Sequence, residues 1–363
     1  MGSTIGENLR LSVFGESHGE AIGAVLDGLP AGFELSFDSI LVQMARRAPG
    51  GAASTPRKEA DMPKILSGVY RGKTTGAPLA VMIENTSAHP DDYENLSDIP
   101  RPSHADYPAY VKYSGHSDVR GGGHFSGRLT APLVFAGAVC RQLLEKRGVI
   151  IGGHAAQIGL VVDERFDPLG VSQDLLKRLS GETFPVTDSA KKSAMLAEIE
   201  DARLDRDSVG GVVEVAATGL PVGLGEPMFG GVENRLAALF FGIPAVKGVE
   251  FGSGFTLAGM RGSVANDAYF TDGAHIGVKT NHNGGLLGGL TTGAPLIARL
   301  AIKPTPSIFR EQESVSLSKM ENRPLVINGR HDPCVVPRAV PIAEAVLAFG
   351  LLDLLHSASG TSR

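Results

Sequence analysis

The spacing of apolar residues along the chain predicts two helices with recognisable ends. In residues 36–47 the apolar positions fall near one face, and Ser36 has the side chain of a helix N-cap. In residues 131–147 an apolar stripe runs the length of the segment, with Pro132 in the first turn and Gly148 after the last. We therefore expect both segments to be helices that bury one face.

Further patterns complete the predicted elements. Residues 189–206 have the pattern of a more polar helix, whereas residues 339–356 are apolar nearly all round, which is typical of a helix buried on more than one side. Short apolar runs at 9–14 and 21–27 predict strands on either side of a glycine-flanked turn. A β-branched run within residues 208–225 predicts another strand, followed by a glycine-proline turn.

A six-residue sequence, TTGAPL, occurs at residues 74–79 and again at residues 291–296. The glycines before each copy and the apolar alternation after it are repeated as well. Such an identity within one chain is improbable by chance, so we interpret the copies as two related strand–turn–strand units. The sequence therefore predicts a pseudo-duplicated α+β fold, with two similar halves packed into one body.

Length and composition are those of a folded globular protein. The chain has 363 residues, enough by length for about two domains of ordinary size, and 42% of them are apolar. Its 47 glycines and 22 prolines are spread along the chain, which indicates many tight turns. Little apolar surface anchors the stretches 48–62 and 88–128, so we expect mobile loops there that become ordered when ligands bind.

The net charge and the cysteines narrow the class of protein. A formal charge of −5 argues against nucleic-acid binding. Cys140 and Cys334 have no CxxC spacing, which argues against a zinc–thiolate site or a disulfide framework and fits a reducing compartment. No run reaches the roughly 18 apolar residues of a membrane span. We therefore expect a soluble cytoplasmic protein that does not bind a membrane.

Several arginines lie in segments rich in glycine, proline or histidine. Arginine binds carboxylates and phosphates through two parallel hydrogen bonds and stays charged when water is removed. In an acidic protein this distribution suggests a basic pocket for a small polyanionic molecule, although ordinary surface ion pairs explain any single arginine as well. These residues are Arg47, Arg57, Arg101, Arg120, Arg128 and Arg330.

The stretch RGGGHFSGRLTAP, residues 120–132, places a glycine-rich loop directly before a predicted helix. Such a loop presents backbone N–H groups and the positive end of the helix dipole to an anion. It lacks the GxxxxGK[ST] pattern of a P-loop and the βαβ context of a dinucleotide fingerprint. By itself the loop is weak evidence for anion binding.

Two histidines lie in similar turns, His18 in ESHG and His104 in RPSHAD. An imidazole can give a proton to a leaving phosphate near pH 7, although a lone loop histidine is more often structural. Asp332 in GRHDPC is either a turn residue or a base held in the pocket. KPTPSI, residues 303–308, supplies a lysine and two hydroxyls in a rigid segment, which suits a phosphate or is simply a proline-rich loop.

Together these motifs resemble the chorismate synthase family over essentially the whole chain. The resemblance implies a β-α-β sandwich in a single domain, usually assembled as a homotetramer. It implies a lyase of the shikimate pathway that leads to the aromatic amino acids, which eliminates phosphate from 5-enolpyruvylshikimate 3-phosphate in an anti-1,4 sense to give chorismate. It also implies a requirement for reduced FMN with no net redox change. The motifs in order are FGESHG, RPSHADY, RGGGHFSGR, LPVGLGEPMF, PAVKGVEFGSGF, GGLLGGLTTGAPL, KPTPSI and GRHDPCVVPRAVPIAEA.

The same resemblance implies roles for individual residues. His18 matches the acid for the departing phosphate, and His104 the group that protonates the reduced flavin. Asp332, assisted by Ser17, matches the acidic residue that relays a proton near flavin N5. The implied substrate-binding residues are Arg47, Arg57, Arg101 and Arg128. The implied FMN-binding residues are Ser126, Gly127, Ala245, Gly288, Lys303, Thr305 and Ser307, with Arg330 at the boundary between flavin and substrate.

The chain departs from the family pattern at four places. His124 and Leu129 stand where the family usually has arginine and glutamate, and Ser103 stands where it usually has glycine. The loop after Arg47 lacks an arginine that the family commonly carries. A protonated His124 is a candidate substitute for the lost cation, which predicts weaker substrate binding at alkaline pH.

Two other functions stay open at this point. One is a diverged, non-catalytic protein that binds flavin or anions. The other is a metal-dependent phosphohydrolase, although the spacing of its candidate ligands matches no zinc motif. Those ligands are His89, Asp91, His104, Asp106, His116, Asp118 and His124. Because no reductase motif is recognisable, we expect an external flavin reductase or another source of reduced flavin. The sequence leaves open whether the protein reduces its own flavin with NADPH, which would make NADP a second cofactor.

Overall fold

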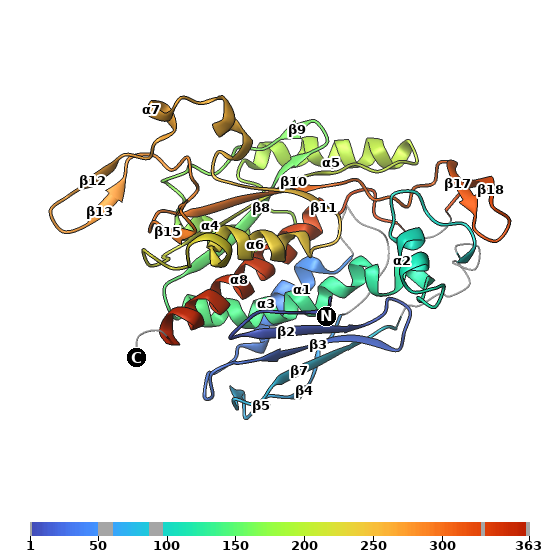
Figure 1. The fold of residues 1–363 in the computed structure, drawn as a ribbon, viewed down its shortest axis with the longest axis horizontal. Coiled ribbons are helices and arrows are strands. Elements are labelled where there is room, and N and C mark those ends of the chain that lie inside the picture. Colours follow the sequence, from blue (N-terminus) through green and yellow to red (C-terminus); the bar gives the residue numbers. More distant parts are fainter. Residues whose placement is uncertain (1, 50–60, 87–96, 328–330, 361–363) are drawn as a thin grey trace.

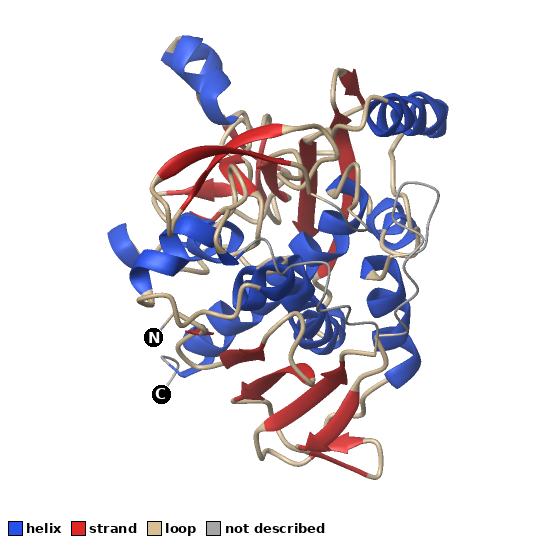
Figure 2. Cartoon of the chain, turned by 90° about the vertical axis from the view of Figure 1, so that its right-hand side faces the viewer, coloured by secondary structure: helices blue, strands red, loops and turns tan. Residues whose placement is uncertain are grey.

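Two five-stranded antiparallel sheets lie on either side of a layer of helices (Figure 1, Figure 2), and the far face of the second sheet is covered in part by residues 173–179. The computed structural model describes residues 2–49, 61–86, 97–327 and 331–360. The first sheet has the order β1-β2-β3-β7-β4, with β1 (Thr4–Ile5), β2 (Arg10–Gly15), β3 (Ala21–Asp27), β7 (Leu79–Glu84) and β4 (Lys64–Ser67). The second has the order β11-β16-β10-β8-β9, with β11 (Val246–Phe251), β16 (Leu296–Ile302), β10 (Gly211–Thr218), β8 (Ile150–Ile158) and β9 (Val161–Val162).

Apart from insertions, the two halves of the chain follow the same path. The first half runs β2, β3, α1, β4, the hairpin β5–β6, β7 and α3, and the second runs β8, β10, α6, β11, the hairpin β14–β15, β16 and α8. Equivalent strands also occupy equivalent positions, as β2-β3-β7-β4 in one sheet and β8-β10-β16-β11 in the other. The predicted pseudo-duplicated α+β sandwich is therefore confirmed. The new elements are α1 (Phe37–Arg47), α3 (Thr130–Glu145), α6 (Val232–Phe241), α8 (Val336–Gly360), β5 (Val69–Tyr70), β6 (Lys73–Thr74), β14 (Leu286–Leu287) and β15 (Leu290–Thr291).

The two TTGAPL copies make the same hydrogen bonds. The hydroxyl of Thr74 donates to the carbonyl of Pro30 at 2.6 Å, and that of Thr291 donates to the carbonyl of Pro221 at 2.5 Å. In both halves the amide three residues after the proline donates back to the same hydroxyl at 2.9 Å. Each threonine, the last residue of its small hairpin, thus ties that hairpin to a Leu-Pro turn, which is why the sequence repeats there.

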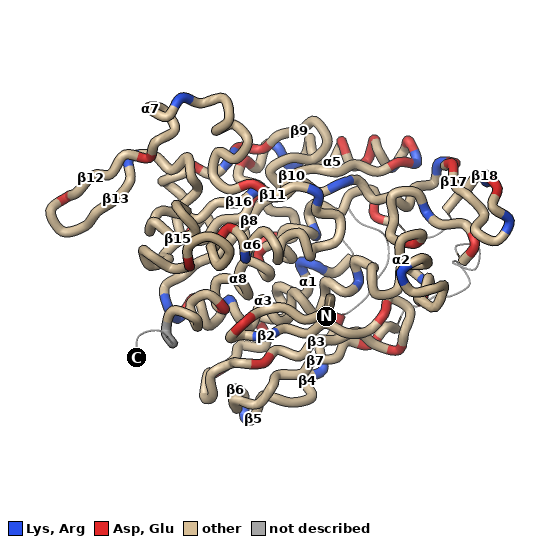
Figure 3. Tube along the Cα trace, in the orientation of Figure 1, with Lys and Arg blue, Asp and Glu red and all other residues tan. Residues whose placement is uncertain are grey.

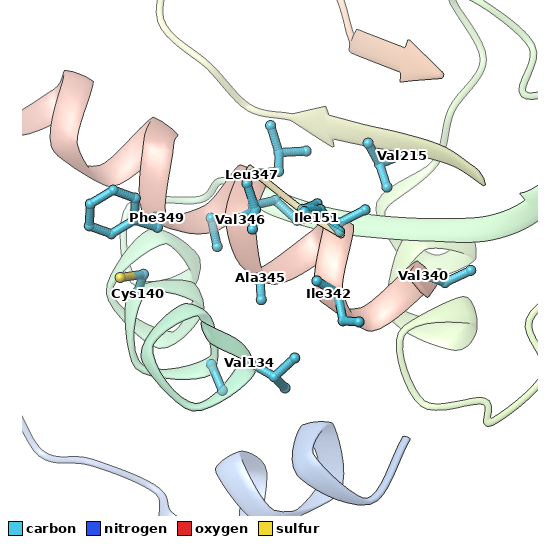
Figure 4. Packing of buried hydrophobic residues seen from close by; sticks show 14 of the residues in the cluster. Val134, Cys140, Ile151, Val215, Val340, Ile342, Ala345, Val346, Leu347 and Phe349 are labelled. Atoms are coloured by element: carbon cyan, nitrogen blue, oxygen red, sulfur yellow. The ribbon is translucent and has the colours of Figure 1, made fainter. Parts of the chain in front are cut away.

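Helices α3 and α8 cross at the centre of the sandwich, and their backbones touch. A Cβ atom on Gly137 would lie 2.3 Å from the Cα of Ala345, so only glycine allows this approach. Around the crossing, Val134 and Cys140 of α3 belong to the same buried cluster as Phe349 of α8, and Cys140 lies beside Phe349 in the close view of the core (Figure 4). Each fully buried aliphatic side chain in such a layer contributes roughly 1.5–3 kcal/mol.

The last helix of the chain, predicted at 339–356, begins three residues earlier, at Val336. Among the described residues it is the one helix long and apolar enough to cross a membrane, over Val336–Ala358. However, 89% of its most apolar window is buried inside the protein, as the all-round apolar pattern predicts. It is the core helix of the sandwich.

The other predicted elements are also present. Ser36 caps α1, and its hydroxyl accepts a hydrogen bond from the amide of Ser39. The polar helix is α5 (Ser189–Leu204). Residues of both charge signs lie along this helix and along the β17–β18 hairpin (Figure 3). Elements outside the duplicated core are α2 (Asp106–Lys112), α4 (Gln173–Leu179), α7 (Gly262–Ala265), β12 (Tyr269–Thr271), β13 (Ile276–Val278), β17 (Gln312–Ser316) and β18 (Glu321–Leu325).

A row of charged side chains crosses the second sheet, with one residue on each of four neighbouring strands. His154, Glu214, Arg299 and Glu250 are direct cross-strand partners in the register of the sheet. The two ring nitrogens of His154 lie 2.9 Å from Asp163 Oδ2 and 3.0 Å from Glu214 Oε2. Burial alone would lower the pKa of His154, but the hydrogen bonds to these two carboxylates raise it. Both ring nitrogens of His154 therefore face carboxylate oxygens, an arrangement that stabilises the protonated ring.

Candidate active site

A cavity of about 840 Å³ opens at one edge of the helical layer, and both halves of the chain contribute to its wall. The first half supplies the β2–β3 turn, the end of α1 and the segment before α3, and the second supplies the loop before β11, the segment after β16 and the start of α8. Sequence motifs that are far apart in the chain therefore meet here. The predicted site residues in the lining are Ser17, His18, Arg47, Arg101, His104, Ser126, Gly127, Arg128, Ala245, Lys303, Thr305, Ser307 and Asp332.

The three-glycine segment, residues 121–123, contacts both predicted catalytic histidines. A Cβ atom on Gly121 would lie 2.2 Å from Cε1 of His18, and one on Gly122 would lie 3.0 Å from Cε1 of His104. Both glycines have positive φ, +58° and +88°, a region that other residues rarely adopt. Two consecutive glycines are thus needed here for the backbone path and for close contact with the imidazoles.

His104 belongs to a buried cluster with Asp106 and Arg101. Its Nδ1 lies 2.5 Å from Asp106 Oδ1, while the other carboxylate oxygen accepts from Arg101 Nε at 2.7 Å. Burial alone would raise the pKa of Asp106, but hydrogen bonds from Arg101 and His104 outweigh it and hold that pKa well below its ordinary value. Because the ionised carboxylate can only accept, Nδ1 of His104 carries a proton, and Nε2 is the atom available on the side of Gly122.

Arg47 and Arg128 share one buried carboxylate, that of Asp61. Arg47 Nη1 lies 2.5 Å from Asp61 Oδ2, and Arg128 Nη1 is paired with Oδ1 of the same residue. The Nε atoms of the two arginines donate to Thr130 Oγ1 at 3.1 Å and to Asn85 Oδ1 at 3.0 Å. Burial would raise the pKa of Asp61, but the two guanidinium groups lower it. No local sequence signal identifies Asp61, because its burial depends on the convergence of the two arginines.

Lys303 and its neighbours form a second polar corner of the cavity. Its ammonium group donates to the backbone carbonyl of Ser103 and, at 3.0 Å, to the hydroxyl of the same residue. Loss of hydration, and then repulsion by Lys247, lowers the pKa of Lys303. Ser103 has a φ of +59°, which explains why glycine is usual in the motif. The buried hydroxyl of Thr305 has no hydrogen-bond partner among the described residues, so an anion bound in this corner would satisfy it.

Asp332 is ion-paired with Arg338, a residue of α8 that also lines the cavity. Arg338 Nε donates to the backbone carbonyl of Arg47, the last residue of α1, at 2.8 Å. Sequence reasoning placed Arg338 just outside the predicted helix and assigned it no role. Its involvement depends on how α1 and α8 meet, which no local pattern reveals.

His124, the departure from the family's usual arginine, has both ring nitrogens close to uncharged groups. Nδ1 lies 2.8 Å from the carbonyl oxygen of Gly15, and Nε2 lies 2.9 Å from the hydroxyl of Ser3. The carbonyl can only accept, so Nδ1 is the donor, and a neutral ring meets both contacts. His124 therefore links the three-glycine segment to the N-terminal strand without needing a positive charge.

The lining combines several cationic side chains with many apolar ones. Among the described lining residues, six are lysine or arginine and one, Asp332, is acidic. Even with Asp61 and Asp106 behind the arginines, positive charge is in excess, which suits a polyanion. The apolar side chains suit a flat, poorly charged ring. The cations are Arg47, Arg101, Arg128, Lys247, Lys303 and Arg338, and the apolar residues include Leu133, Phe241, Ile342, Val346 and Phe349.

Three predicted residues are not brought to this cavity by the described structure. Gly288 lies in the tight β14–β15 turn with a φ of +62° and is absent from the lining. Arg57 and Arg330 lie outside the described residues, as do most of the stretch 48–62 and residues 88–96, so the expected loop mobility stays a prediction. In the part of the chain that is described, no three His, Cys, Asp or Glu side chains are grouped to hold a metal ion, while His89 and Asp91 of the alternative site lie outside it.

Comparison with known proteins gives a consistent result. The sequence model of the chorismate synthase family matches residues 9–356. The chorismate synthase of Thermococcus kodakarensis is 47% identical over 350 residues, which cover 96% of this chain and 96% of that protein. The chorismate synthase of Dehalococcoides mccartyi strain BAV1 is 43% identical over 355 residues, which cover 98% and 96%. A crystal structure of a chorismate synthase, 29% identical, matches with a TM-score of 0.76 over 98% of this chain and 94% of that one.

Proposed function

The chain belongs to the chorismate synthase family, and from this premise we propose that it converts 5-enolpyruvylshikimate 3-phosphate into chorismate and phosphate with reduced FMN bound. In this reaction a proton leaves one end of an allylic system and phosphate leaves the other, so the ring gains a double bond without net oxidation. The observation that carries the proposal is the single cationic cavity in which His18, His104 and Asp332 lie together.

The arginines of the first half are proposed to bind the carboxylates and the phosphate of the substrate. Arg47 and Arg128 are held by Asp61, and Arg101 by Asp106, so their guanidinium groups are already fixed before an anion arrives. A close charge pair is worth up to about 4 kcal/mol at an effective dielectric of 20, before desolvation is counted. Fixed arginines also lose little side-chain entropy on binding.

His18 is proposed to give a proton to the departing phosphate oxygen. It is buried in the β2–β3 turn with its ring against Gly121, and its charge interacts with that of Asp118. Hydrogen bonds from Arg120 chiefly lower the pKa of Asp118, and the nearby His18 contributes. Protonating a leaving phosphate in this way contributes about 10²–10⁴-fold to a rate.

Asp332 and His104 are proposed to handle the other protons. The carboxylate of Asp332, assisted by Ser17, accepts the proton that leaves the ring, and Nε2 of His104 holds a proton opposite Gly122. Support comes from the fixed Nδ1–H of His104 and from the presence of all three residues in the lining. The side chains of His104 and Asp332 are 16% and 10% exposed, so both are largely shielded from competing water.

The residues present fit reduced FMN. Lys303 and Thr305 would hold its phosphate. The Thr305 hydroxyl lacks a partner among the described residues, and a bound anion would also relieve the repulsion between Lys303 and Lys247. Ser126, Gly127, Ala245 and Ser307 also lie in the lining and are proposed to contact the cofactor. When bound, reduced flavin supplies electron density or a basic nitrogen, which the protein's own side chains do not offer.

The test is an anaerobic assay of chorismate formation with chemically reduced FMN. Wild-type protein should form chorismate and phosphate in equal amounts and keep its activity in a chelator. The variants His18→Ala and Asp332→Asn should lose most of kcat while still binding oxidised FMN. Flavin binding without product would instead indicate a non-catalytic relative, and chelator-sensitive phosphate release without chorismate would indicate a metal-dependent phosphohydrolase.

We further propose a homotetramer in the cytoplasm that takes reduced flavin from a separate reductase. Support for assembly is the projecting β12–β13 hairpin, whose Tyr269 and Ile276 are mostly exposed. Both cysteines are free and buried, which fits a reducing compartment. Sedimentation would test the assembly, and chorismate formation from oxidised FMN and NADPH without a reductase would contradict the external source.

A further inference from the structure

We propose that Arg338 is a positioning residue for the reaction, acting through Asp332 and through the end of helix α1. The inference rests on the proposed function, in which the Asp332 carboxylate accepts a proton and must therefore be correctly placed. Arg338 belongs to the second half of the chain, yet it contacts groups from both halves at the cavity wall.

Two different nitrogens of Arg338 make the two contacts. Nη1 is paired with Asp332 Oδ2, while Nε donates to the carbonyl of Arg47 at 2.8 Å. That carbonyl belongs to the last residue of α1, at the end of the helix where carbonyl groups accept hydrogen bonds from outside the helix. The planar guanidinium therefore sets the distance between Asp332 and the backbone that carries Arg47.

Helix stability does not explain an arginine at this position. Arg338 lies in the first turn of α8, which starts at Val336, and the helix dipole disfavours a cation at that end. The Asp332 carboxylate, a few residues before the helix, offsets this and is itself favoured at that end. The side chains of Arg338 and Asp332 are 20% and 10% exposed, so the pair is shielded without being cut off from the cavity.

The inference is tested with Arg338→Met, Arg338→Lys, Asp332→Asn and the double variant Arg338→Met/Asp332→Asn. In the anaerobic assay we expect Arg338→Met to lower kcat about tenfold to a hundredfold with a smaller change in KM, as for a misplaced group. Arg338→Lys should restore little, because one ammonium cannot make both contacts. The double variant should be no slower than Asp332→Asn within about twofold, since Arg338 acts through Asp332.

Arg141→Met is the matched control for loss of a mostly buried, ion-paired arginine. Arg141 pairs with Glu344 in the helical layer and does not line the cavity, so its variant should unfold at lower urea concentration but keep kcat. The same double-variant cycle measured by urea unfolding tests the Arg338–Asp332 pair without any substrate.

The outcomes distinguish failure of the positioning role of Arg338 from failure of the proposed function. Independent, multiplicative losses of kcat, full activity in Arg338→Met, or full rescue by Arg338→Lys would overturn the positioning role. Independent shifts of the unfolding midpoint would show that the two side chains are not coupled, which also contradicts the inference. A wild-type protein that makes no chorismate would contradict the proposed function and the positioning role of Arg338 with it, whatever the unfolding cycle shows.

Discussion

Gly121 lies against the imidazole of His18 so closely that a Cβ atom on residue 121 would come within 2.2 Å of the ring. We predict that Gly121→Ala displaces His18 and lowers kcat about tenfold to a hundredfold, because small misplacements of a reacting group are costly. Steady-state kinetics with reduced FMN would measure this effect.

A matched control for Gly121→Ala is Gly148→Ala. Gly148 also has a positive φ, +79°, but no atom lies within 4 Å of its Cβ position and it is outside the cavity. Both variants should lose about 1–2 kcal/mol of stability from the backbone conformation. If both also lose kcat equally, the contact with His18 is not the cause.

Asp61→Asn should destabilise the protein strongly. The Asp61 side chain is fully buried, and its loss leaves the guanidinium groups of Arg47 and Arg128 without their shared carboxylate, which costs about 3–5 kcal/mol. Sulfate should recover more stability in this variant than in wild type, because an anion can replace the carboxylate between the arginines. Urea unfolding with and without sulfate measures both effects.

The comparison for Asp61→Asn is Glu182→Gln, which breaks an exposed pair with Arg178 four residues apart on the chain. Such pairs contribute about 0.3–0.5 kcal/mol, so this variant should unfold almost as wild type does and show no special response to sulfate. A small effect of Asp61→Asn, similar to that of Glu182→Gln, would mean that the buried carboxylate is not holding the arginines.

The buried charge row should make stability depend on pH at both ends. Because the pKa of His154 is raised, its contribution is complete below the unfolded value of about 6.5 and is lost as pH rises through the folded value. Hydrogen bonds from His154 and from backbone amides outweigh burial and lower the pKa of Asp163 to about 2, so its contribution is present above about 3.9 and lost as pH falls toward 2.

Urea midpoints measured from pH 3 to pH 9 would test this prediction. His154→Gln should remove the decline of stability on the alkaline side, relative to wild type at each pH. His275→Gln is the control, because His275 is exposed and its nearest carboxylate, on Asp272, is 3.6 Å away. Parallel pH profiles of wild type and His154→Gln would contradict a buried imidazolium.

His124 should not act as the pH-dependent cation that its place in the motif suggests. A neutral ring satisfies both its contacts, to Gly15 and to Ser3, so we expect His124→Gln to bind the substrate within about threefold of wild type from pH 6 to pH 9. Affinity that weakens at alkaline pH in wild type but not in His124→Gln would restore the earlier hypothesis that His124 replaces an arginine.

The sequence predicted the parts of the fold that repeat or that follow a clear helical period. The TTGAPL copies pointed to the duplicated halves, and Thr74 and Thr291 make the same hydrogen bonds. Strand β8 was not predicted, because it is buried on both faces and its glycines and His154 interrupt any alternation. Its role as a central strand depends on neighbours that lie far away in the sequence.

At the candidate site, sequence motifs predicted the groups that face the cavity better than those that support them. His18 and Arg128 lie in recognisable glycine-rich segments and His104 lies in the RPSHAD turn, whereas Asp61 lies in no motif. Arg338 lies within the motif GRHDPCVVPRAVPIAEA, but its position there gave no sign of a chemical role. A supporting residue is defined by what it meets in three dimensions, as Arg338 meets the carbonyl of Arg47. Local sequence patterns contain no information about such tertiary contacts.

The backbone contact between Gly137 and Ala345 has a consequence for how the protein unfolds. Each sheet packs against one of the two helices that carry these residues, and the helices are in direct backbone contact. Neither half can therefore unfold without exposing the apolar layer of the other half. Denaturation should therefore be all-or-none, with no half-melted species that keeps one sheet. Isolated halves would lack a complementary surface and would aggregate instead of folding.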